Sequence, residues 1–330
     1  YSRSGKPVTA TDLKAVGAMT AVLRDAAKPN LVQTLEATPA LIHAGPFANV
    51  AHGCSSVIAT RLGMSLCDYF VTEAGFGSEL GAEKFFNIKC RTAGLRPDAV
   101  VISTTIRALK YQAGVPLPQT SEENVAAVEG GVDNLAKHIE NVKLHGITPV
   151  VGINKFTSDT DAEVKAVQDR CAAEGVKAVE VEVWAKGGEG GLVLVDAVRE
   201  VCDQPKEFRH LYDVEASVEE KLEAIATKMY GAADIQLGPD AVKSLAQIKK
   251  LGYDKLPVCM AKTQNSLSDN TALKGRPTGF TTVIRDLKVS AGAGFIVAYA
   301  GNVLTMFGFP EHPAAENIDV TEDGTITGLF

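Results

Sequence analysis

Short apolar runs alternate with amphipathic stretches between Leu31 and about Glu200. This alternation is typical of βα units that build a mainly parallel sheet flanked by helices. It predicts strands over residues 40–44, 67–74, 98–109, 148–154 and 176–184, the last ending at Trp184. Helices are predicted between them, over residues 54–66, 81–90, 122–145 and 161–175.

The helix predicted from Asp161 has the most clearly defined ends. Thr160 and Glu163 form a T-x-x-E capping box, in which each side chain bonds to the backbone N–H of the other residue. Gly175 supplies the stop, because glycine readily adopts the left-handed conformation that ends many helices. The sequence therefore predicts a strand, a short polar loop and a helix in direct succession.

The pattern changes after Glu215. Two helices are predicted over residues 218–230 and 239–250, and a block of shorter β-rich segments follows, rich in glycine and threonine. This texture favours a separate carboxy-terminal α+β domain. The fold class predicted for the chain is α/β, with a smaller α+β part at the carboxyl end.

Composition narrows the functional classes. The 330 residues are 45% hydrophobic and 22% charged, as in globular chains of two or three domains, and the net charge of −7 argues against nucleic acid as a partner. No run of about 18 apolar residues occurs, so no membrane span is predicted. The six cysteines are scattered without a CxxC pair, which predicts mostly buried reduced thiols, no metal site and a cytoplasmic location.

Two aromatic residues are expected at one edge of the predicted sheet. Phe156 follows one strand and Trp184 ends the next, and ligands of open parallel sheets bind beyond the carboxyl ends of the strands. Two rings about 7 Å apart would sandwich a flat heterocycle. The glycines of WAKGGEGG, residues 184–191, would let the backbone approach it, and Lys186 would meet a carboxylate or phosphate.

Two other interpretations of WAKGGEGG stay open from the pattern. The aromatics are local core residues and the glycines only turn the chain, or the loop cradles phosphate. A phosphate loop needs GxxxxGK[ST], and here the lysine precedes the glycines; the motif occurs nowhere in the chain. A ring platform is therefore favoured over a phosphate cradle.

A second candidate joins a predicted strand to a helix at EAGFGSELG, residues 73–81. Gly75 and Gly77 flank Phe76, so the backbone amides of Gly77 and Ser78 would face an anion at the start of the helix. Glu79 would repel a phosphate there unless its side chain turns away. The alternative is a tight turn without a ligand.

Two polar stretches are weaker candidates. His43, Asn49 and His52 lie in one loop, but without a third ligand they suit structural hydrogen bonds better than a metal or catalysis. In TSDTDAE, the capping box explains Glu163 and the helix dipole suits Asp161, so acid–base chemistry by these residues or Asp159 is the minority interpretation.

Taken together, these stretches resemble the formate–tetrahydrofolate ligase (10-formyltetrahydrofolate synthetase) family. The resemblance covers essentially the whole chain in order, and its specificity lies in the combination. The segments that carry it are residues 32–56, 71–91, 152–163, 184–191, 261–270 (AKTQNSLSDN), 275–280 (GRPTGF), 290–295 (SAGAGF) and 318–330.

The resemblance implies a carbon–nitrogen ligase whose small-molecule substrates are formate, MgATP and tetrahydrofolate. Formate attacks the γ-phosphate to give formyl phosphate and ADP; N10 of the folate then attacks the formyl carbon, and phosphate leaves. The protein contributes positioning and charge stabilisation. The resemblance also implies a homotetramer, and a monovalent cation whose identity the sequence does not determine.

The resemblance also implies roles for individual residues. Phe156 and Trp184 match the pair that sandwiches the pterin ring, and Phe76 matches an aromatic residue near the adenine. Gly75, Gly77 and Ser78 would lie close to the nucleotide. A folate contact for Lys186 is our own extension of the pattern.

One departure from the family pattern matters. The family's phosphate loop and its basic formyl-phosphate site lie in an amino-terminal segment that this chain does not contain, so no catalytic residue is assigned. The chain is thus expected to be a carboxy-terminal portion, completed in cis or in trans and inactive alone. Residues 1–134 would be the later part of an incomplete P-loop-type nucleotide domain, 135–217 an α/β domain with the pterin platform, and 218–330 the α+β domain.

Two alternatives to a ligase remain at this stage. A non-catalytic folate-binding or assembly fragment of the same family is the first. A nicotinamide oxidoreductase is the second, but no strand–GxGxxG–helix unit with a following acidic residue occurs in the chain.

Overall fold

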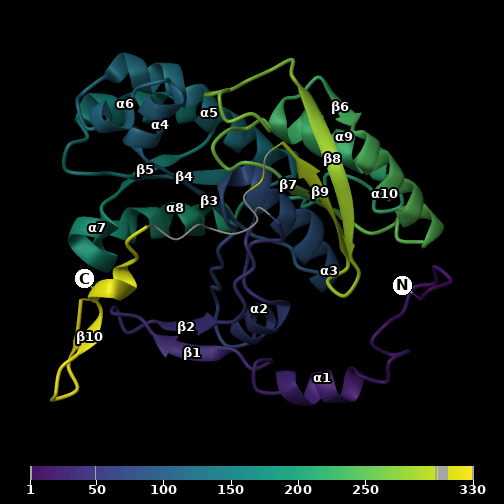
Figure 1. The fold of residues 1–330 in the computed structure, drawn as a ribbon. Coiled ribbons are helices and arrows are strands. Elements are labelled where there is room, and N and C mark those ends of the chain that lie inside the picture. The colour runs from purple at the N-terminus through teal and green to yellow at the C-terminus, as the bar shows by residue number, and fades with distance from the viewer. Residues whose placement is uncertain (1, 49, 302, 304–310, 329–330) are drawn as a thin grey trace.

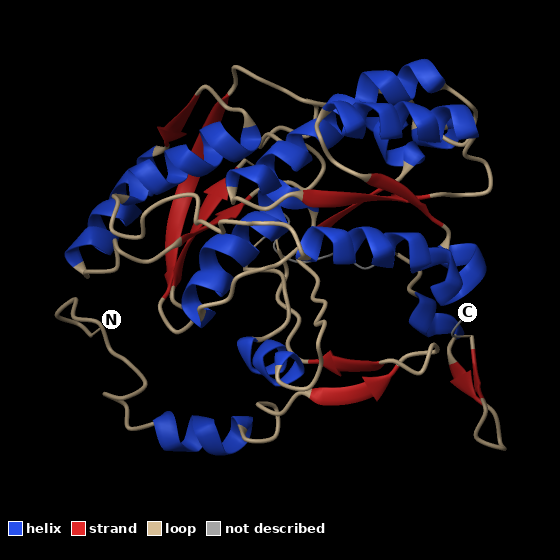
Figure 2. Ribbon diagram, turned by 180° about the vertical axis from the view of Figure 1, so that it is seen from behind, coloured by secondary structure: helices blue, strands red, loops and turns tan. Residues whose placement is uncertain are grey.

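The computed structural model describes residues 2–48, 50–301, 303 and 311–328 (Figure 1). The first described elements are a helix α1 (Val16–Leu23), an antiparallel pair of strands β1 (Asn30–Gln33) and β2 (Pro39–Ile42), and a helix α2 (Val57–Met64). Figures 1 and 2 show these elements beside the main body of the molecule. The helix predicted over 54–66 is confirmed, and so is most of the strand predicted over 40–44.

The central sheet is parallel, as predicted, with the order β3 (Val100–Thr104), β4 (Pro149–Asn154) and β5 (Ala178–Val181). Successive side chains of a strand point to opposite faces. Helices α4 (Ile106–Gln112), α5 (Val125–Leu144) and α6 (Asp161–Ala173) therefore share one core with Val151 and Ile153, while Val150 packs with α8 (Leu192–Cys202) on the other face (Figure 1).

Helix α6 begins as the sequence predicts. The Thr160 hydroxyl accepts the N–H of Glu163, the Glu163 carboxylate accepts the N–H of Thr160, and Gly175 has a φ of 67° just beyond the helix. Glu163 has a second role that the capping box does not reveal: its carboxylate lies 2.5 Å from the buried ammonium of Lys110 on α4. The same residue thus caps one helix and ties it to another.

The prediction of a strand over residues 67–74 is wrong. These residues form an extended loop, and the Val71 side chain is 88% exposed. A strand needs a neighbour that accepts its backbone hydrogen bonds. Among the described strands, the parallel sheet consists of β3, β4 and β5 alone.

Two further boundaries differ from the sequence prediction. The strand predicted over 98–109 ends at Thr104, because the Thr105 hydroxyl accepts the N–H of Ala108 and starts α4 there. The next difference concerns Trp184, which does not end β5: that strand ends at Val181, and Trp184 lies in the short helix α7 (Val183–Lys186). A helix cap and a local turn overrode β propensity in these two places.

A helical segment predicted over 81–90 extends from Gly77 to Ala93. It contains the π-helical turns η1 (Gly77–Ala82) and η2 (Phe85–Cys90), followed by the short helix α3 (Arg91–Ala93). Phe85 and Phe86 pack in one core with Val142 of α5 and Ile102 of β3, while Ile88 packs against Phe295 and Val297 of the carboxy-terminal sheet. The segment thus joins the two halves of the molecule.

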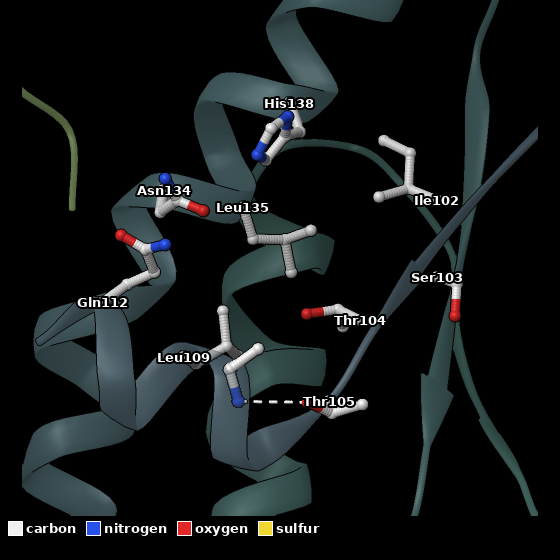
Figure 3. Close-up of a pocket in the computed structure, with 10 residues that line it drawn as sticks. Ile102, Ser103, Thr104, Thr105, Leu109, Gln112, Asn134, Leu135 and His138 are labelled. Atoms are coloured by element: carbon white, nitrogen blue, oxygen red, sulfur yellow. Dashed lines mark hydrogen bonds between the residues drawn. The ribbon is translucent and has the colours of Figure 1, made fainter. Parts of the chain in front are cut away.

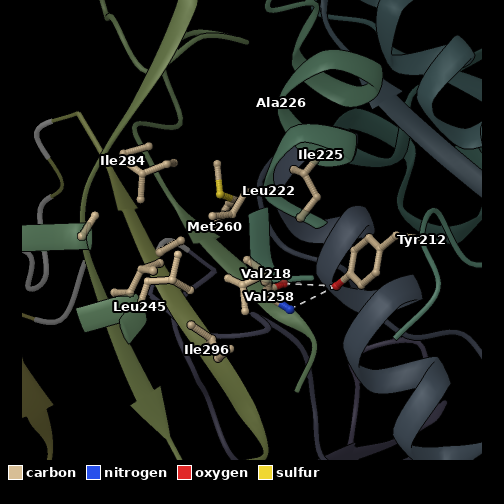
Figure 4. Packing of buried hydrophobic residues seen from close by; sticks show 14 of the residues in the cluster. Tyr212, Val218, Leu222, Ile225, Ala226, Leu245, Val258, Met260, Ile284 and Ile296 are labelled. Atoms are coloured by element: carbon tan, nitrogen blue, oxygen red, sulfur yellow. Dashed lines mark hydrogen bonds between the residues drawn. The ribbon is translucent and has the colours of Figure 1, made fainter. Parts of the chain in front are cut away.

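The carboxy-terminal sheet has the order β6 (Asp234–Leu237), β8 (Thr281–Ser290), β9 (Phe295–Ala300) and β7 (Val258–Ala261). It is mixed, with an antiparallel β8–β9 pair between two parallel pairs. The predicted helices appear as α9 (Val218–Ala224) with the π-helical turn η5 (Ile225–Tyr230), and as α10 (Pro239–Lys250). Figure 4 shows the apolar core between helices and sheet, with Tyr212 bonded to Val258 at its margin.

The smaller elements complete the chain: the 3₁₀ turns η3 (Leu117–Gln119), η4 (Gly187–Gly191) and η6 (Ala314–Asn317), and the strand pair β10 (Asp319–Val320) and β11 (Ile326–Thr327). None of the helices in the described ranges is long and apolar enough to cross a bilayer. The predicted division near residue 134 falls inside α5, and the three-part domain division stays a prediction.

Candidate functional site

Two adjoining cavities lie where the carboxyl end of β3 meets α4 and α5. The first has a volume of about 220 Å³ (Figure 3), and the second, of about 190 Å³, lies toward the Gly75–Ser78 turn. Gln112, Asn134 and His138 line both cavities and so join them into one hollow. The first is lined mainly by apolar, hydroxyl and amide groups, which suits an uncharged ring or sugar better than a phosphate.

The Gly75–Ser78 turn is tightly folded against its own helix. Phe76 has a φ of 28° and Gly77 a φ of 59°, conformations that favour glycine and are strained for phenylalanine. A Cβ atom on Gly81 would lie 1.2 Å from the carbonyl oxygen of Gly75. The Phe76 ring is 42% exposed. The turn therefore presents its aromatic side chain outward while its backbone packs closely.

Side chains of α5 hold Ser78. The His138 Nδ1 atom lies 3.3 Å from the backbone nitrogen and 2.8 Å from the hydroxyl oxygen of Ser78. Asn141 donates from Nδ2 to the same hydroxyl oxygen, at 3.1 Å, and to the carbonyl oxygen of Met229. The turn is thus fixed by residues about 60 positions away in the sequence.

Glu79 is buried and paired, which answers the expected conflict with an anion. The Lys262 Nζ lies 3.2 Å from Glu79 Oε1, and it also donates to the carbonyl oxygens of Thr263 and Ser266. Burial lowers the pKa of Lys262, whereas the Glu79 carboxylate favours its charged form. The negative charge at the start of the helix is therefore balanced from within the protein.

Two polar loops of the carboxy-terminal part, AKTQNSLSDN and GRPTGF, border these cavities. Gln264, Ser266 and Leu267 of AKTQNSLSDN line the second cavity. In GRPTGF, Gly275 donates its N–H to Gln112 Oε1 at 3.0 Å and accepts from Asn134 Nδ2 at 2.8 Å. Segments that are far apart in the sequence, around Gly77, around Asn134 and around Gly275, thus meet at the site.

Sequence reasoning missed Gln112, Asn134, His138 and Lys262 as lining or supporting residues. A signal for part of this set was present: Asn134, His138 and Asn141 recur at the i, i+4, i+7 spacing of one helix face. Polar residues in such a stripe on a largely buried helix indicate a functional or structural network. Lys262 had no comparable local signal.

Phe156 and Trp184 leave the sheet at the same edge. Asn154 at the end of β4 pairs with Val181 at the end of β5, and the two aromatic residues follow these positions by two and three residues. The Arg107 guanidinium of α4 lies 4.5 Å from the centroid of the Phe156 ring and also donates to the Ser158 hydroxyl. Arg107 therefore covers one face of Phe156, a contact that the sequence did not suggest.

The glycine loop after Trp184 is held by local contacts. Trp184 is 74% exposed, and Lys186 forms an ion pair with Glu182. Gly190 packs directly on the end of β5, since a Cβ there would lie 2.5 Å from the Glu182 carbonyl group. At the outer side, Gly188 donates its N–H to Glu36 Oε1 at 2.8 Å. Gly188 and Gly190 therefore allow the backbone of the loop to lie close to other parts of the protein.

The weaker candidates have structural contacts. His43 bonds through both ring nitrogens, to the Ser56 hydroxyl at 2.7 Å and the Ala26 carbonyl oxygen at 2.8 Å. The pKa of His52 is lowered by burial, and its ring packs edge-on against Phe295. Asn49 lies outside the described residues.

Two carboxylates of TSDTDAE also have local partners. Asp159 accepts the N–H of Phe156 at 2.9 Å, which fixes the loop beneath that ring. Asp161 pairs with Lys155 at 2.9 Å.

Four of the six free cysteines are buried, as expected, and burial raises the pKa of the Cys54 and Cys259 thiols to about 11. In the ranges that the structure describes, no group of three His, Cys, Asp or Glu side chains is arranged to hold a metal.

Comparison with known protein families identifies the family of this chain. The sequence model of the family described as formate–tetrahydrofolate ligase matches residues 1–330, the whole chain. The chain belongs to the formate–tetrahydrofolate ligase family. It is therefore a carbon–nitrogen ligase of one-carbon metabolism, and membership implies ATP and tetrahydrofolate as substrates beside formate. The family recognised from the sequence is confirmed, and the oxidoreductase alternative is wrong.

Proposed function

We propose that the chain binds the nucleotide at the Gly75–Ser78 turn and the pterin ring of tetrahydrofolate between Phe156 and Trp184. The observation that carries this assignment is the position of α4. Its residues Leu109 and Gln112 line the cavities beside the turn, while Arg107 contacts Phe156. A single helix thus bounds both proposed sites at one sheet edge, where ligands of parallel sheets bind.

The pterin assignment rests on the two aromatic residues and their surroundings. Phe156 has Arg107 on one side, so its other face is the one proposed to receive the pterin. The high exposure of Trp184 leaves its ring accessible for stacking. Lys186 would contact the folate glutamate only after leaving Glu182, so it is the weakest member of the proposed set.

The nucleotide assignment places the Phe76 ring against the adenine, and the backbone of Gly75, Gly77 and Ser78 beside the nucleotide. The amide and hydroxyl groups of the adjoining cavities suit the uncharged parts of the ligand. The balanced charge of Glu79 supports this assignment, because an unpaired carboxylate at the turn would repel phosphate.

The proposed reaction proceeds in two steps. A formate oxygen bonds to the γ-phosphorus as the bond to ADP breaks, and N10 of the folate then bonds to the formyl carbon as phosphate leaves and N10 loses its proton. The protein's contribution is to hold the reactants in line. The proposal includes homo-oligomeric assembly and activation by a monovalent cation. We further propose that these 330 residues alone do not turn over ATP, because they contain no GxxxxGK[ST] loop.

Trp184 is the only tryptophan and offers a direct test of the pterin site. Tetrahydrofolate should quench its fluorescence in a saturable manner, after correction for inner-filter absorption. Stacking contributes roughly 0.5–1.5 kcal/mol beyond area burial, so Phe156→Ala should weaken binding at least several-fold. Trp184→Ala, followed by calorimetry, should do the same and leave MgADP affinity unchanged.

The controls distinguish the two proposed sites and test whether the 330-residue chain is inactive by itself. Phe76→Ala should weaken MgADP binding and leave the folate titration unchanged. Unaltered folate affinity in both Phe156→Ala and Trp184→Ala would remove the platform from the site. Formate-dependent ADP release by the pure 330-residue chain would refute the proposed need for a separate phosphate loop.

A further inference from the structure

His138 occupies the point where the Gly75–Ser78 turn meets both cavities. Its Nδ1 atom faces three groups: the Ser78 backbone nitrogen at 3.3 Å, the Ser78 hydroxyl at 2.8 Å and Glu79 Oε2 at 3.4 Å. The imidazole is therefore in contact with the turn on one side and lines the hollow on the other (Figure 3).

The contact with the amide determines the proton position on the ring. A backbone N–H can only donate, so Nδ1 must accept, and the imidazole is neutral with its proton on Nε2. Asn141 donates to the Ser78 hydroxyl oxygen, so the hydroxyl proton is available to Nδ1, which lies 2.8 Å from that oxygen. His138 is thus the acceptor that ties the turn to α5.

We propose that His138 is a positioning residue that holds the Ser78 amide while neutral and releases it on protonation, when its Nδ1 contact passes to Glu79. The inference rests on the proposed nucleotide site for its functional consequence. In the released state the strained turn loses an anchor, and nucleotide affinity falls while the folate platform is unaffected.

A protonated Nδ1 keeps two possible acceptors, the Ser78 hydroxyl oxygen and Glu79 Oε2, and neither of them is the Ser78 amide. A protonated Nδ1 would bring its N–H against the N–H of Ser78, and two donors cannot bond to each other. Glu79 Oε2, in contrast, is buried without a hydrogen-bond partner among the described residues, and it lies within reach. Protonation therefore exchanges one partner for the other by a small movement.

The surroundings set the direction of the equilibrium. Burial and the positive charges of Lys262, beyond β7, and Lys137, on α5 itself, lower the pKa of His138 below its usual 6.5, while Glu79 on η1 opposes them. The neutral state that holds Ser78 is accordingly favoured at neutral pH. Acidification shifts His138 toward Glu79 Oε2, while Lys262 stays paired with Oε1 of the same carboxylate.

Holding the turn matters because its conformation is strained. The positive φ value of Phe76 persists only when surrounding contacts determine it. The Gly75 N–H bonds to the Gly53 carbonyl oxygen at 3.1 Å on one side of the turn, and His138 anchors the other side. Loss of the His138 contact should therefore loosen the residues proposed to face the nucleotide.

The test compares two variants of the full 330-residue chain at roughly pH 5 and pH 8. His138→Asn keeps an acceptor near the position of Nδ1 but cannot be protonated, and His138→Leu removes the acceptor. Amide hydrogen exchange at Ser78 is measured by NMR without ligand, MgADP affinity by calorimetry, and folate binding by Trp184 fluorescence. Nitrogen chemical shifts of the imidazole report the tautomer directly.

In His138→Leu at pH 8 we expect Ser78 exchange about five- to tenfold faster and MgADP binding weaker by a similar factor, with folate binding unchanged. The unaltered protein should show the same loss at the pH where the imidazole nitrogen shifts report a protonated His138, and His138→Asn should be far less sensitive to pH. If His138→Leu does not fold, the pH dependence of the unaltered protein against His138→Asn decides the question.

Ser78 exchange that is independent of His138 and of its protonation would overturn the inference, as would a proton on Nδ1 at pH 8. Failure of the proposed function would look different. No MgADP binding by the unaltered protein, with Ser78 exchange behaving as expected, would refute the nucleotide assignment and the functional half of this proposal, and leave the contact itself established.

Discussion

The two proposed ligand-binding segments are built in opposite ways. The Gly75–Ser78 turn is held by residues distant in sequence, among them His138 and Lys262, and its charges are paired in the interior. The Trp184–Gly191 loop is largely exposed; most of its contacts are local, and the distant one is the bond from Gly188 to Glu36. The comparison suggests that the first is preorganised by the fold, whereas the second can adapt to its ligand at little cost.

The largest difference is expected when each segment loses a lysine. Lys262→Met leaves Glu79 buried without its counter-ion and should lower the free energy of unfolding by about 3–5 kcal/mol. Lys186→Met removes only an exposed pair with Glu182 and should change it by less than about 1 kcal/mol. Urea denaturation followed by circular dichroism measures both. Equal effects would show that the buried pair is not what distinguishes the turn.

A smaller effect on the free energy of unfolding is expected from the buried carboxyl group of Glu83, and this effect depends on pH. Burial raises the pKa of Glu83, beneath the turn, from 4.5 to about 7 in the folded protein. Between these values the folded state binds the proton of Glu83 more tightly, so the contribution of Glu83 to stability is fully present below pH 4.5 and is lost as the pH rises through about 7. The slope contributed by Glu83 should approach about 1.4 kcal/mol per pH unit.

The control for this prediction is a glutamate of the exposed loop. Glu83→Gln should remove that contribution from the pH profile of unfolding, and Glu189→Gln serves as the matched control for the loss of one carboxylate. A Glu83→Gln profile that overlays that of the unaltered protein between pH 4.5 and 7 would contradict the prediction.

The smallest expected difference concerns glycines. Gly81→Ala places a Cβ atom 1.2 Å from the Gly75 carbonyl oxygen, so the backbone must move, at a cost of roughly 1–3 kcal/mol in stability. In Gly188→Ala the nearest atoms belong to the Glu36 carboxylate, 3.2 Å away, which can swing aside. Thermal unfolding should separate the two variants, and a Gly188→Ala variant as unstable as Gly81→Ala would mean that the loop is as rigid as the turn.

Local signals predicted much of the fold. Helix α6 followed from its capping box, and β4 and α5 followed from uninterrupted apolar or amphipathic patterns. The wrong predictions arose where a strand-like segment had no neighbouring strand, or where a helix cap interrupted a strand-like pattern. Residues 67–74 are β-like in composition but have no adjacent strand, and the Thr105 cap turns the second half of a predicted strand into α4.

The candidate site was predictable only in part. Glycine spacing and the two aromatic residues drew attention to the carboxyl ends of the parallel strands, and the family match agrees with the ligase expected from the sequence. The roles proposed for Phe156, Trp184 and the glycine turn remain predictions. Arg107 on Phe156 and His138 on Ser78 could not be foreseen, because no sequence spacing relates residues on different elements.

The sequence by itself determined the family, the parallel arrangement of β3, β4 and β5, and the start of α6, because each depends on a motif or a periodicity within a short stretch. Tertiary structure alone decided how Glu79 is neutralised and which side chain holds Ser78. The interactions responsible join residues up to 183 positions apart, and their strength depends on burial, which no local pattern encodes.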